Sequence, residues 1–338
     1  MRLGLTFGYW RRGPASGVVE LAQEAERLGF DSVWTAESWG SDAFTPLTWI
    51  AAATSRIGLG TAVTQMSART PTVTAMHALT LDHLSNGRVI LGLGMSGPQV
   101  VEGWYGRPFP GSPLTFTREY VDVIRQVLRR QGPVELDGRY VQVPYRGDDG
   151  TGLGKALKSI THPRRPGLPL FLGAAGPKNV RLTTQIADGW LPLHWSPYNL
   201  GAYGDALHDK PDDFRVAPMV QVVVDDDLER AMLPVKASLA FYVGGMGAKD
   251  RNFHADLMRR FGYPDAAARI QALFAAGDRD EAIAAVPSEL VDEIALVGPA
   301  ARIRERFAVW RDDPHVTDMI IGSKNPTTLK LMADLART

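Results

Sequence analysis

The first 35 residues, MRLGLTFGYWRRGPASGVVELAQEAERLGFDSVWT, contain a complete strand–helix–strand unit. Residues 3–7 are mostly apolar and predict a strand. Between Val18 and Leu28 the apolar residues recur with the period of a helix, and Gly29 is the residue type that commonly ends one. Residues 31–35 then predict a second strand. Because strands that alternate with helices in this way pair in the same direction, the stretch indicates a parallel sheet.

The same unit recurs along the rest of the chain. Four units fill about 130 residues, and this spacing extrapolates to a (β/α)8 barrel with insertions, a single domain over residues 1–338. Further strands are predicted at residues 57–63, 88–93, 169–172, 189–193, 216–224 and 318–321, and further helices at residues 44–54, 71–84, 115–130, 178–187, 300–310 and 327–336.

Three segments depart from this rhythm. Residues 226 to about 290 are helical in pattern throughout, and we expect them to form an insertion between barrel elements. Residues 134–145 predict a small hairpin that turns at Asp137 and Gly138. Residues 146–168 are rich in glycine, proline and basic residues, and a loop of that length is usually functional or mobile.

The composition argues against several classes of function. Lysine and arginine total 37, as do aspartate and glutamate, so the net charge of zero gives no case for nucleic acid or an anionic membrane as a partner. The absence of cysteine excludes disulfides and thiol catalysis and fits a cytoplasmic protein. We find no secretory leader pattern and no run of roughly 18 apolar residues. Without an HExxH pattern, Walker loop or GxSxG elbow, the sequence indicates no metal site and none of the commonest hydrolases.

The working face of such a barrel lies where strands end and loops begin. Tyr9 and Trp10 follow the first strand and either floor a pocket for a flat ring or cap the barrel mouth. Glu37 follows the second strand, where a carboxylate can bond the polar edge of a heterocycle or carry a proton; the alternative is a solvated loop acid. His194, at the end of the sixth strand, is a proton donor, a substrate contact or a structural histidine.

Small residues gather at two further strand ends. The third strand ends with Gly60, Thr61, Ala62 and Val63, and the fourth is followed by the glycine-rich run 92–97, which contains Gly94, Met95 and Ser96. Such residues let the backbone approach a ligand closely, although tight packing of the barrel explains them equally well.

The best candidate for an anion site follows the fifth strand. The run Gly173-Ala174-Ala175-Gly176-Pro177-Lys178-Asn179 opens a helix, whose free N–H groups attract phosphate. Lys178 adds positive charge, and the alternative is a structural turn with a surface lysine. In the long loop, Lys155 and Lys158 either meet the anionic tail of a ligand or are simply solvated.

Several motifs, in this order, resemble those of the luciferase-like monooxygenase superfamily, and more closely its coenzyme F420-dependent branch. They are ELAQEAE at residues 20–26, GFDSVW at 29–34, RIGLGT at 56–61, RTP at 69–71, TLDHLSNGR at 80–88, LGLG at 91–94, ADGW at 187–190 and LVGP at 296–299. The resemblance spans nearly the whole chain, so it is specific for the fold and much less so for a substrate.

The resemblance implies a bacterial luciferase-like TIM barrel with an insertion between the seventh and eighth strands. Relatives bind FMN or F420 at the mouth formed by the carboxyl ends of the strands, and they are often dimers. A cis peptide bond without proline supports the central ring, and here it would join Ala62 to Val63. The phosphate would lie on residues 176–179. Glu37 stands where many F420-dependent relatives have an aspartate followed by histidine, but Ser38 replaces that histidine here.

The resemblance also implies hydride transfer between a deazaflavin and a small organic substrate stacked on its ring. The cofactor would be coenzyme F420, with FMN as the alternative, and Lys155 and Lys158 would suit the acidic oligoglutamyl tail of F420. The substrate wall would be aromatic, made of Tyr9, Trp10, Trp39 and Trp195. The sequence names no substrate.

Three other functions stay open. An FMN-dependent monooxygenase on the same fold would use reduced flavin and oxygen. A phosphate-binding barrel lyase or isomerase needs a Schiff-base lysine or a metal at a strand end, and the sequence places neither well. A non-catalytic flavin-binding barrel would bind the cofactor without turnover.

Overall fold

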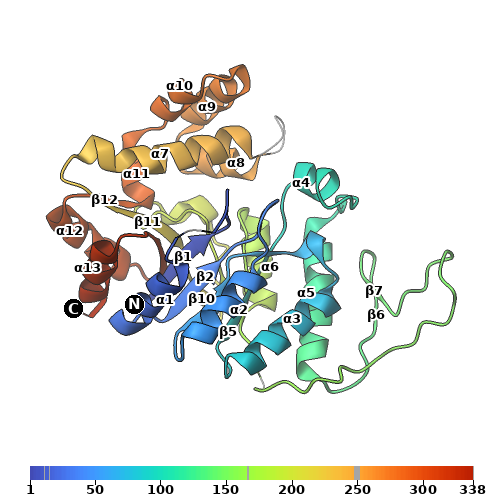
Figure 1. Ribbon diagram of the computed structural model, residues 1–338. Coiled ribbons are helices and arrows are strands. Elements are labelled where there is room, and N and C mark those ends of the chain that lie inside the picture. The colour runs from blue at the N-terminus through green and yellow to red at the C-terminus, as the bar shows by residue number, and fades with distance from the viewer. Residues whose placement is uncertain (11, 15, 166, 247–251, 338) are drawn as a thin grey trace.

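Strands and helices alternate through the first half of the chain, as the sequence predicts (Figure 1). The computed structural model describes residues 1–10, 12–14, 16–165, 167–246 and 252–337. The elements of the first half are β1 (Arg2–Gly8), α1 (Val18–Leu28), β2 (Ser32–Thr35), α2 (Phe44–Ala53), β3 (Gly58–Thr61), β4 (Thr64–Gln65), a 3-10 turn (Met66–Ala68), α3 (Pro71–Leu84), β5 (Val89–Gly94), α4 (Pro98–Gly103) and α5 (Pro113–Arg129). Helix α4 is not predicted from the sequence, because six residues are too few to show a helical period.

The second half adds helices between its last strands. Its elements are β6 (Leu136–Asp137), β7 (Gln142–Val143), β8 (Leu170–Leu172), α6 (Pro177–Ile186), β9 (Gly189–Trp190), a second 3-10 turn (Leu200–Tyr203), β10 (Arg215–Val216), β11 (Met219–Val224), α7 (Leu228–Gly245), α8 (Phe253–Arg260), α9 (Pro264–Ala276), α10 (Arg279–Ala284), α11 (Ser288–Ile294), β12 (Leu296–Gly298), α12 (Ala300–Arg311), β13 (Asp318–Gly322) and α13 (Pro326–Arg337). None of the described helices is long and apolar enough to cross a membrane.

The segment expected to be helical, residues 226 to about 290, contains α7 to α10 and the start of α11. Residues 247–251 of this segment lie outside the described residues. The helices α7 to α10 pack against one another and lie beyond the carboxyl ends of the strands (Figure 1). The strand β12 follows these helices and pairs with β11. It is not predicted from the sequence, because three apolar residues are too few to show a strand or helix period.

The fold is an α/β fold built on one curled parallel sheet, in the order β10-β9-β8-β5-β3-β2-β1-β13-β11-β12, with β4 beside β5. The strand expected at residues 216–224 is divided into β10 and β11 around Ala217 and Pro218, because proline has no N–H to donate to a neighbouring strand. The N–H of Ala217 donates to the carbonyl of Trp190 (2.9 Å), and the carbonyl of Pro218 accepts from Ile320 (2.9 Å). Ala217 therefore bonds to β9, and the next residue, Pro218, bonds to β13.

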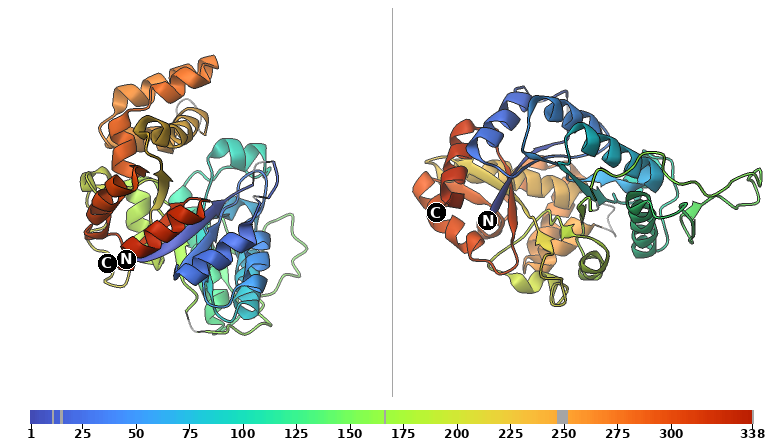
Figure 2. Two further views of the ribbon diagram at one scale, coloured as in Figure 1. Left: turned by 60° about the vertical axis from the view of Figure 1, so that its left-hand side comes forward. Right: turned by 90° about the horizontal axis from the view of Figure 1, so that it is seen from below.

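The sheet has a packed apolar layer on each face. The larger cluster lies between the strands and the surrounding helices, and a smaller one contains Trp34, Ala62, Ile90, Phe171, Leu191, Ala217 and Ile320. Gly60 leaves room for the Trp34 ring in the smaller cluster, because a Cβ there would lie 2.1 Å from a ring carbon. Helices surround the sheet when it is viewed from below (Figure 2, right).

The segment after α5 projects from the rest of the molecule in two views (Figures 1 and 2). It contains the expected hairpin, in which β6 and β7 are antiparallel. The predicted turn at Asp137 and Gly138 is wrong in detail: Asp137 pairs with Gln142, so residues 138–141 form the connection. The Glu119 carboxylate organises this connection, because it accepts hydrogen bonds from the N–H groups of residues 139, 140 and 141 at 2.8, 2.8 and 2.9 Å.

Candidate active site

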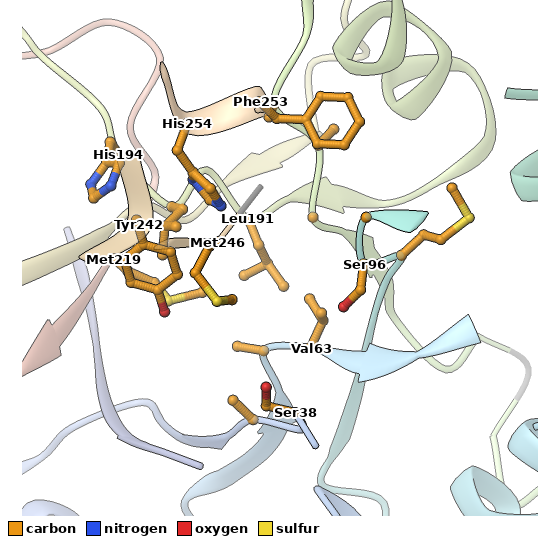
Figure 3. Close-up of a pocket in the computed structure, with 18 of the residues that line it drawn as sticks. Ser38, Val63, Ser96, Leu191, His194, Met219, Tyr242, Met246, Phe253 and His254 are labelled. Carbon is orange, nitrogen blue, oxygen red and sulfur yellow. The ribbon is translucent and has the colours of Figure 1, made fainter. Parts of the chain in front are cut away.

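A cavity of about 1290 Å³ opens where the parallel strands end. Residues that follow β1, β2, β3, β5, β8 and β9 line one part of it, and residues of α7 and α8 line another. Typical small-molecule pockets measure roughly 300–1,000 Å³, so this cavity has room for a cofactor head group and a second molecule beside it. Its side chains converge on a shared space from opposite sides (Figure 3).

The loop predicted to bind phosphate lines this cavity along its whole length, residues 173–179. Gly176 caps α6, and Pro177 begins it. Two side chains that the sequence analysis missed hold the loop: Trp190 Nε1 donates to the carbonyl of Ala174 (2.9 Å), and Arg260 Nη2 donates to the carbonyl of Ala175 (2.6 Å). The start of α6 therefore faces the cavity from a fixed position.

The end of the cavity at α6 has the donors and acceptors that a phosphorylated sugar-alcohol chain needs. The first turn of a helix presents N–H groups that attract anions, and Lys178 lies in this turn and lines the cavity. Asn179 Oδ1 is buried and accepts no hydrogen bond from any described residue. A hydroxyl of a bound ligand can satisfy this acceptor, so the residues here fit a flavin-type cofactor.

The peptide bond between Ala62 and Val63 is cis, as the resemblance implies, and both residues line the cavity. The carbonyl of Val63 accepts a hydrogen bond from the N–H of Glu37 (3.0 Å). This hydrogen bond joins the cis peptide after β3 to the residues that follow β2. Met95 and Ser96, after β5, also line the cavity.

Two of the predicted cofactor contacts instead stand behind the cavity wall. The Thr61 hydroxyl bonds to the backbone of Gly92, donating to its carbonyl (2.7 Å) and accepting from its N–H (2.8 Å). Gly94 packs against Val63, since a Cβ on it would lie 2.4 Å from Val63 Cγ2. Neither Thr61 nor Gly94 is among the described lining residues. Tight packing, the alternative reading of these small residues, therefore explains both.

Glu37 lines the cavity but is buried, with 8% of its surface exposed. Its neighbours hold it in place. Its Oε2 accepts hydrogen bonds from Thr64 Oγ1 (2.7 Å), the Gln65 N–H (3.1 Å) and Arg69 Nη1 (2.7 Å). Burial lowers the pKa of Arg69, but the hydrogen bond and charge of Glu37 outweigh burial, so this pKa is raised. We call these four residues the Glu37 network; the RTP motif contains Arg69, although spacing alone gave no sign of the pairing.

His194 lines the cavity on the opposite side, after β9, with Tyr242 from α7 and His254 from α8. The rings of His194 and Tyr242 lie edge to face at 6.4 Å, and those of Tyr242 and His254 are tilted at 4.8 Å. Burial, and to a lesser extent His254, lowers the pKa of His194 to about 3, and burial lowers the pKa of His254 to about 4. We call these three residues the histidine wall.

Only two of the four predicted wall aromatics reach the cavity. Tyr9 and Trp39 line it, whereas Trp10 and Trp195 do not belong to its described lining. Trp195 is 1% exposed, because its ring stacks on Tyr203 at 5.7 Å and its Nε1 donates to Asp313 Oδ2 (2.8 Å). The Tyr203 hydroxyl in turn donates to the carbonyl of His194 (2.6 Å). Trp195 therefore supports the position of His194 from behind.

The two lysines of the long loop are not part of the described lining of the cavity. Lys155 and Lys158 belong to the projecting segment, and neither is among the described residues that line the cavity (Figure 1). Lys158 Nζ donates to the carbonyl of Gln131 (3.4 Å). The described residues contain no group of three histidine, aspartate or glutamate side chains arranged to hold a metal ion.

Comparison with known proteins places the chain in a family. The family model described as luciferase-like monooxygenase matches residues 7–316. A Mycobacterium tuberculosis protein, provisionally named a coenzyme F420-dependent oxidoreductase, is 49% identical over 344 residues that cover 99% of each chain. The 5,10-methylenetetrahydromethanopterin reductase of Methanopyrus kandleri is 27% identical over 328 residues, which cover 90% of this chain and 88% of that one.

A solved structure agrees with the fold described above. The coenzyme F420-dependent tetrahydromethanopterin reductase from Methanopyrus kandleri matches with a TM-score of 0.79 at 24% identity, and the match covers 98% of this chain and 97% of that chain. With the family model matching most of its length, the chain belongs to the luciferase-like monooxygenase family and is an oxidoreductase.

Proposed function

We propose that this enzyme binds coenzyme F420 and transfers a hydride between the deazaflavin and an organic substrate. The observation that carries the proposal is a continuous cavity of about 1290 Å³, which joins the start of α6 to Val63 and to the histidine wall. The 49% identity to a relative named for F420 supports this cofactor.

Each part of the cavity has a proposed role. The loop 173–179 and Lys178 hold the phosphate, Asn179 accepts from the ribityl chain, and Val63 supports the ring. When bound, the deazaflavin supplies the hydride chemistry, and the protein orients it and excludes water. Glu37 is proposed as a positioning residue, because three donors already occupy its Oε2.

We further propose that the curled sheet is a complete (β/α)8 barrel in a single domain, with residues 215–224 counted as one strand. Pairing of β10 with β9 and of β11 with β13 supports closure through this segment. The homodimer and the cytoplasmic location stay predictions from the sequence.

Cofactor titrations test the proposal. F420 should bind the wild-type protein, and Lys178→Glu should weaken binding by tenfold or more, on the order of 1.4 kcal/mol, because it puts negative charge beside the phosphate. Lys330→Glu is the matched control, since the same charge change falls on the exposed side of α13, outside the described lining. Equal losses in the two variants would contradict the assignment of the loop at α6.

The same titrations separate the alternatives. Tight binding of FMN with no binding of F420 would favour the FMN-dependent monooxygenase, whose phosphate the same loop could hold. F420 bound without turnover across a broad panel of substrates would favour a non-catalytic barrel.

A further inference from the structure

The histidine wall faces the part of the cavity that the proposed cofactor site does not use. His194, Tyr242 and His254 lie on one side, and Val63 and Ser38 lie on the opposite side (Figure 3). Two of the three residues come from α7 and α8, whereas the loop 173–179 belongs to the strand-end rim. A substrate that lies between the histidine wall and a ring supported by Val63 would therefore contact α7 and α8, apart from the strand-end rim.

Both imidazoles offer hydrogen bonds as neutral groups. His194 Nε2 is buried and has no hydrogen-bond partner among the described residues. Their lowered pKa values, about 3 and about 4, keep both rings uncharged near neutral pH. A neutral imidazole has one N–H donor and one nitrogen acceptor, so it can bond either a hydroxyl or a carbonyl oxygen.

The surroundings of the histidine wall offer little to a charged group. Among the described lining residues, the aspartate, glutamate, lysine and arginine side chains are Glu37 and Lys178 alone. Glu37 is paired with Arg69, and Lys178 lies at the α6 end of the cavity. The described lining that α7, α8 and α11 contribute carries no charged side chain and includes the apolar Val235, Leu257 and Ile294. Burying an unpaired charge in such surroundings is costly.

We infer that the histidine wall binds the uncharged oxygen of a hydroxyl or carbonyl group, on a substrate whose remaining surface is apolar. This inference deepens the proposed function and rests on it for the identity of the reaction. His194 and His254 are specificity residues here: they accept or donate a hydrogen bond to a neutral oxygen and offer no countercharge to a carboxylate or phosphate.

The test uses the full-length protein without F420, labelled with ¹³C in its histidine rings. The His194→Asn and His254→Asn variants assign the two ring signals, and His208→Asn, at an exposed position, is the control. The two ligands are the ketone 1-(4-methylcyclohexyl)ethanone and 4-methylcyclohexanecarboxylate, which have the same arrangement of non-hydrogen atoms and differ in charge. The ketone should shift both assigned signals, and the carboxylate at the same concentration should shift neither. Each wall variant should weaken ketone binding by about threefold to tenfold, and the control should not.

Three outcomes would overturn the inference. In the first, the carboxylate shifts the ring signals of His194 and His254 as strongly as the ketone does. In the second, the ketone leaves both signals unchanged. In the third, either signal titrates between about pH 5.5 and pH 8. Because the measurement needs no cofactor, it is independent of F420 binding. Failure of F420 to bind the same samples would contradict the proposed function and leave the result on the histidines intact.

Discussion

The cavity holds two sets of titratable side chains in opposite electrostatic settings. In the Glu37 network the carboxylate pairs with Arg69, and its Oε2 accepts three hydrogen bonds, one of them from Arg69. In the histidine wall the rings are neutral, and His194 Nε2 has no partner among the described residues. Donors of the protein itself hold the Glu37 carboxylate, whereas His194 Nε2 stays available to a ligand. The difference indicates that a polar atom without a protein partner, whatever its residue type, is the better candidate to bind a substrate.

The largest effect should come from breaking the charged side of this comparison. Glu37→Ala should lower the free energy of unfolding by about 3 kcal/mol, because it leaves the Arg69 guanidinium, 15% exposed, without its partner. Urea denaturation at neutral pH measures the change. The double variant with Arg69→Ala should lose less than the sum of the two single changes.

An exposed ion pair provides the control for Glu37. Glu24 and Arg27 form a bidentate pair on the surface of α1, so Glu24→Ala should change stability far less than Glu37→Ala. If the two glutamate variants lost equal stability, Glu37 would not be a structural carboxylate, and its assignment as a positioning residue would be wrong.

The neutral side of the comparison predicts a dependence of stability on pH. An unfolded histidine takes up a proton near pH 6.5, whereas folded His194 and His254 do so only near pH 3 and pH 4. Between about pH 4 and pH 6.5 the unfolded chain therefore binds more protons than the folded protein, so stability should fall as the pH falls below about 6.5. By about pH 5 each histidine should cost about 2 kcal/mol, and His194→Asn or His254→Asn should remove its share of the loss.

Exposed His208 should behave in the opposite way. Its hydrogen bond with Asp209 raises its pKa, so it stabilises the folded state slightly at low pH. The His208→Asn variant should therefore keep the full acid sensitivity of the wild type. A wild-type unfolding free energy that stays constant between about pH 7 and pH 5 would show that the wall histidines are solvated.

The same contrast explains which site residues the sequence could reveal. The loop 173–179 and the Ala62–Val63 bond follow strands whose apolar runs are visible, so their place at the rim could be predicted. Arg260 and His254 sit on a helix with no link in the sequence to those strands, and only tertiary packing brings them to the cavity. Their helical segment was predicted, but its packing direction was not.

The predicted rim residues that lie outside the described lining share a related cause. A tryptophan after a strand can face the cavity or the core, and Trp195 faces the core because Tyr203 and Asp313 complete its contacts. Thr61 and Gly94 have the right position in the chain, but the Thr61 hydroxyl bonds to Gly92, and the missing Cβ of Gly94 leaves room for Val63. Spacing along the chain predicts position at the rim, and it does not predict which way a side chain points.

A smaller effect should follow from loosening the anion loop. Arg260→Ala removes the hydrogen bonds to the carbonyls of Ala175 and Ala202, so the loop should lose its fixed position. We expect the F420 dissociation constant to rise about fivefold, with a stability loss of about 1 kcal/mol. Arg259→Ala is the control, because the neighbouring arginine pairs with Asp256 on the surface of α8. Equal F420 affinity in both variants would remove Arg260 from the site.

The smallest effect should come from removing one donor of the Glu37 network. Thr64→Val keeps the shape of the side chain but deletes the bond from Oγ1 to Glu37 Oε2 (2.7 Å) and an acceptor for Arg69 (3.1 Å). The expected loss is about 1 kcal/mol, since two donors to the carboxylate remain. Urea denaturation beside Glu37→Ala gives the ratio of the two losses. A loss as large as that of Glu37→Ala would mean that the hydroxyl, rather than the ion pair, holds the carboxylate. A graded loss means that the donors of the network hold the carboxylate together, each contributing part of the stabilisation.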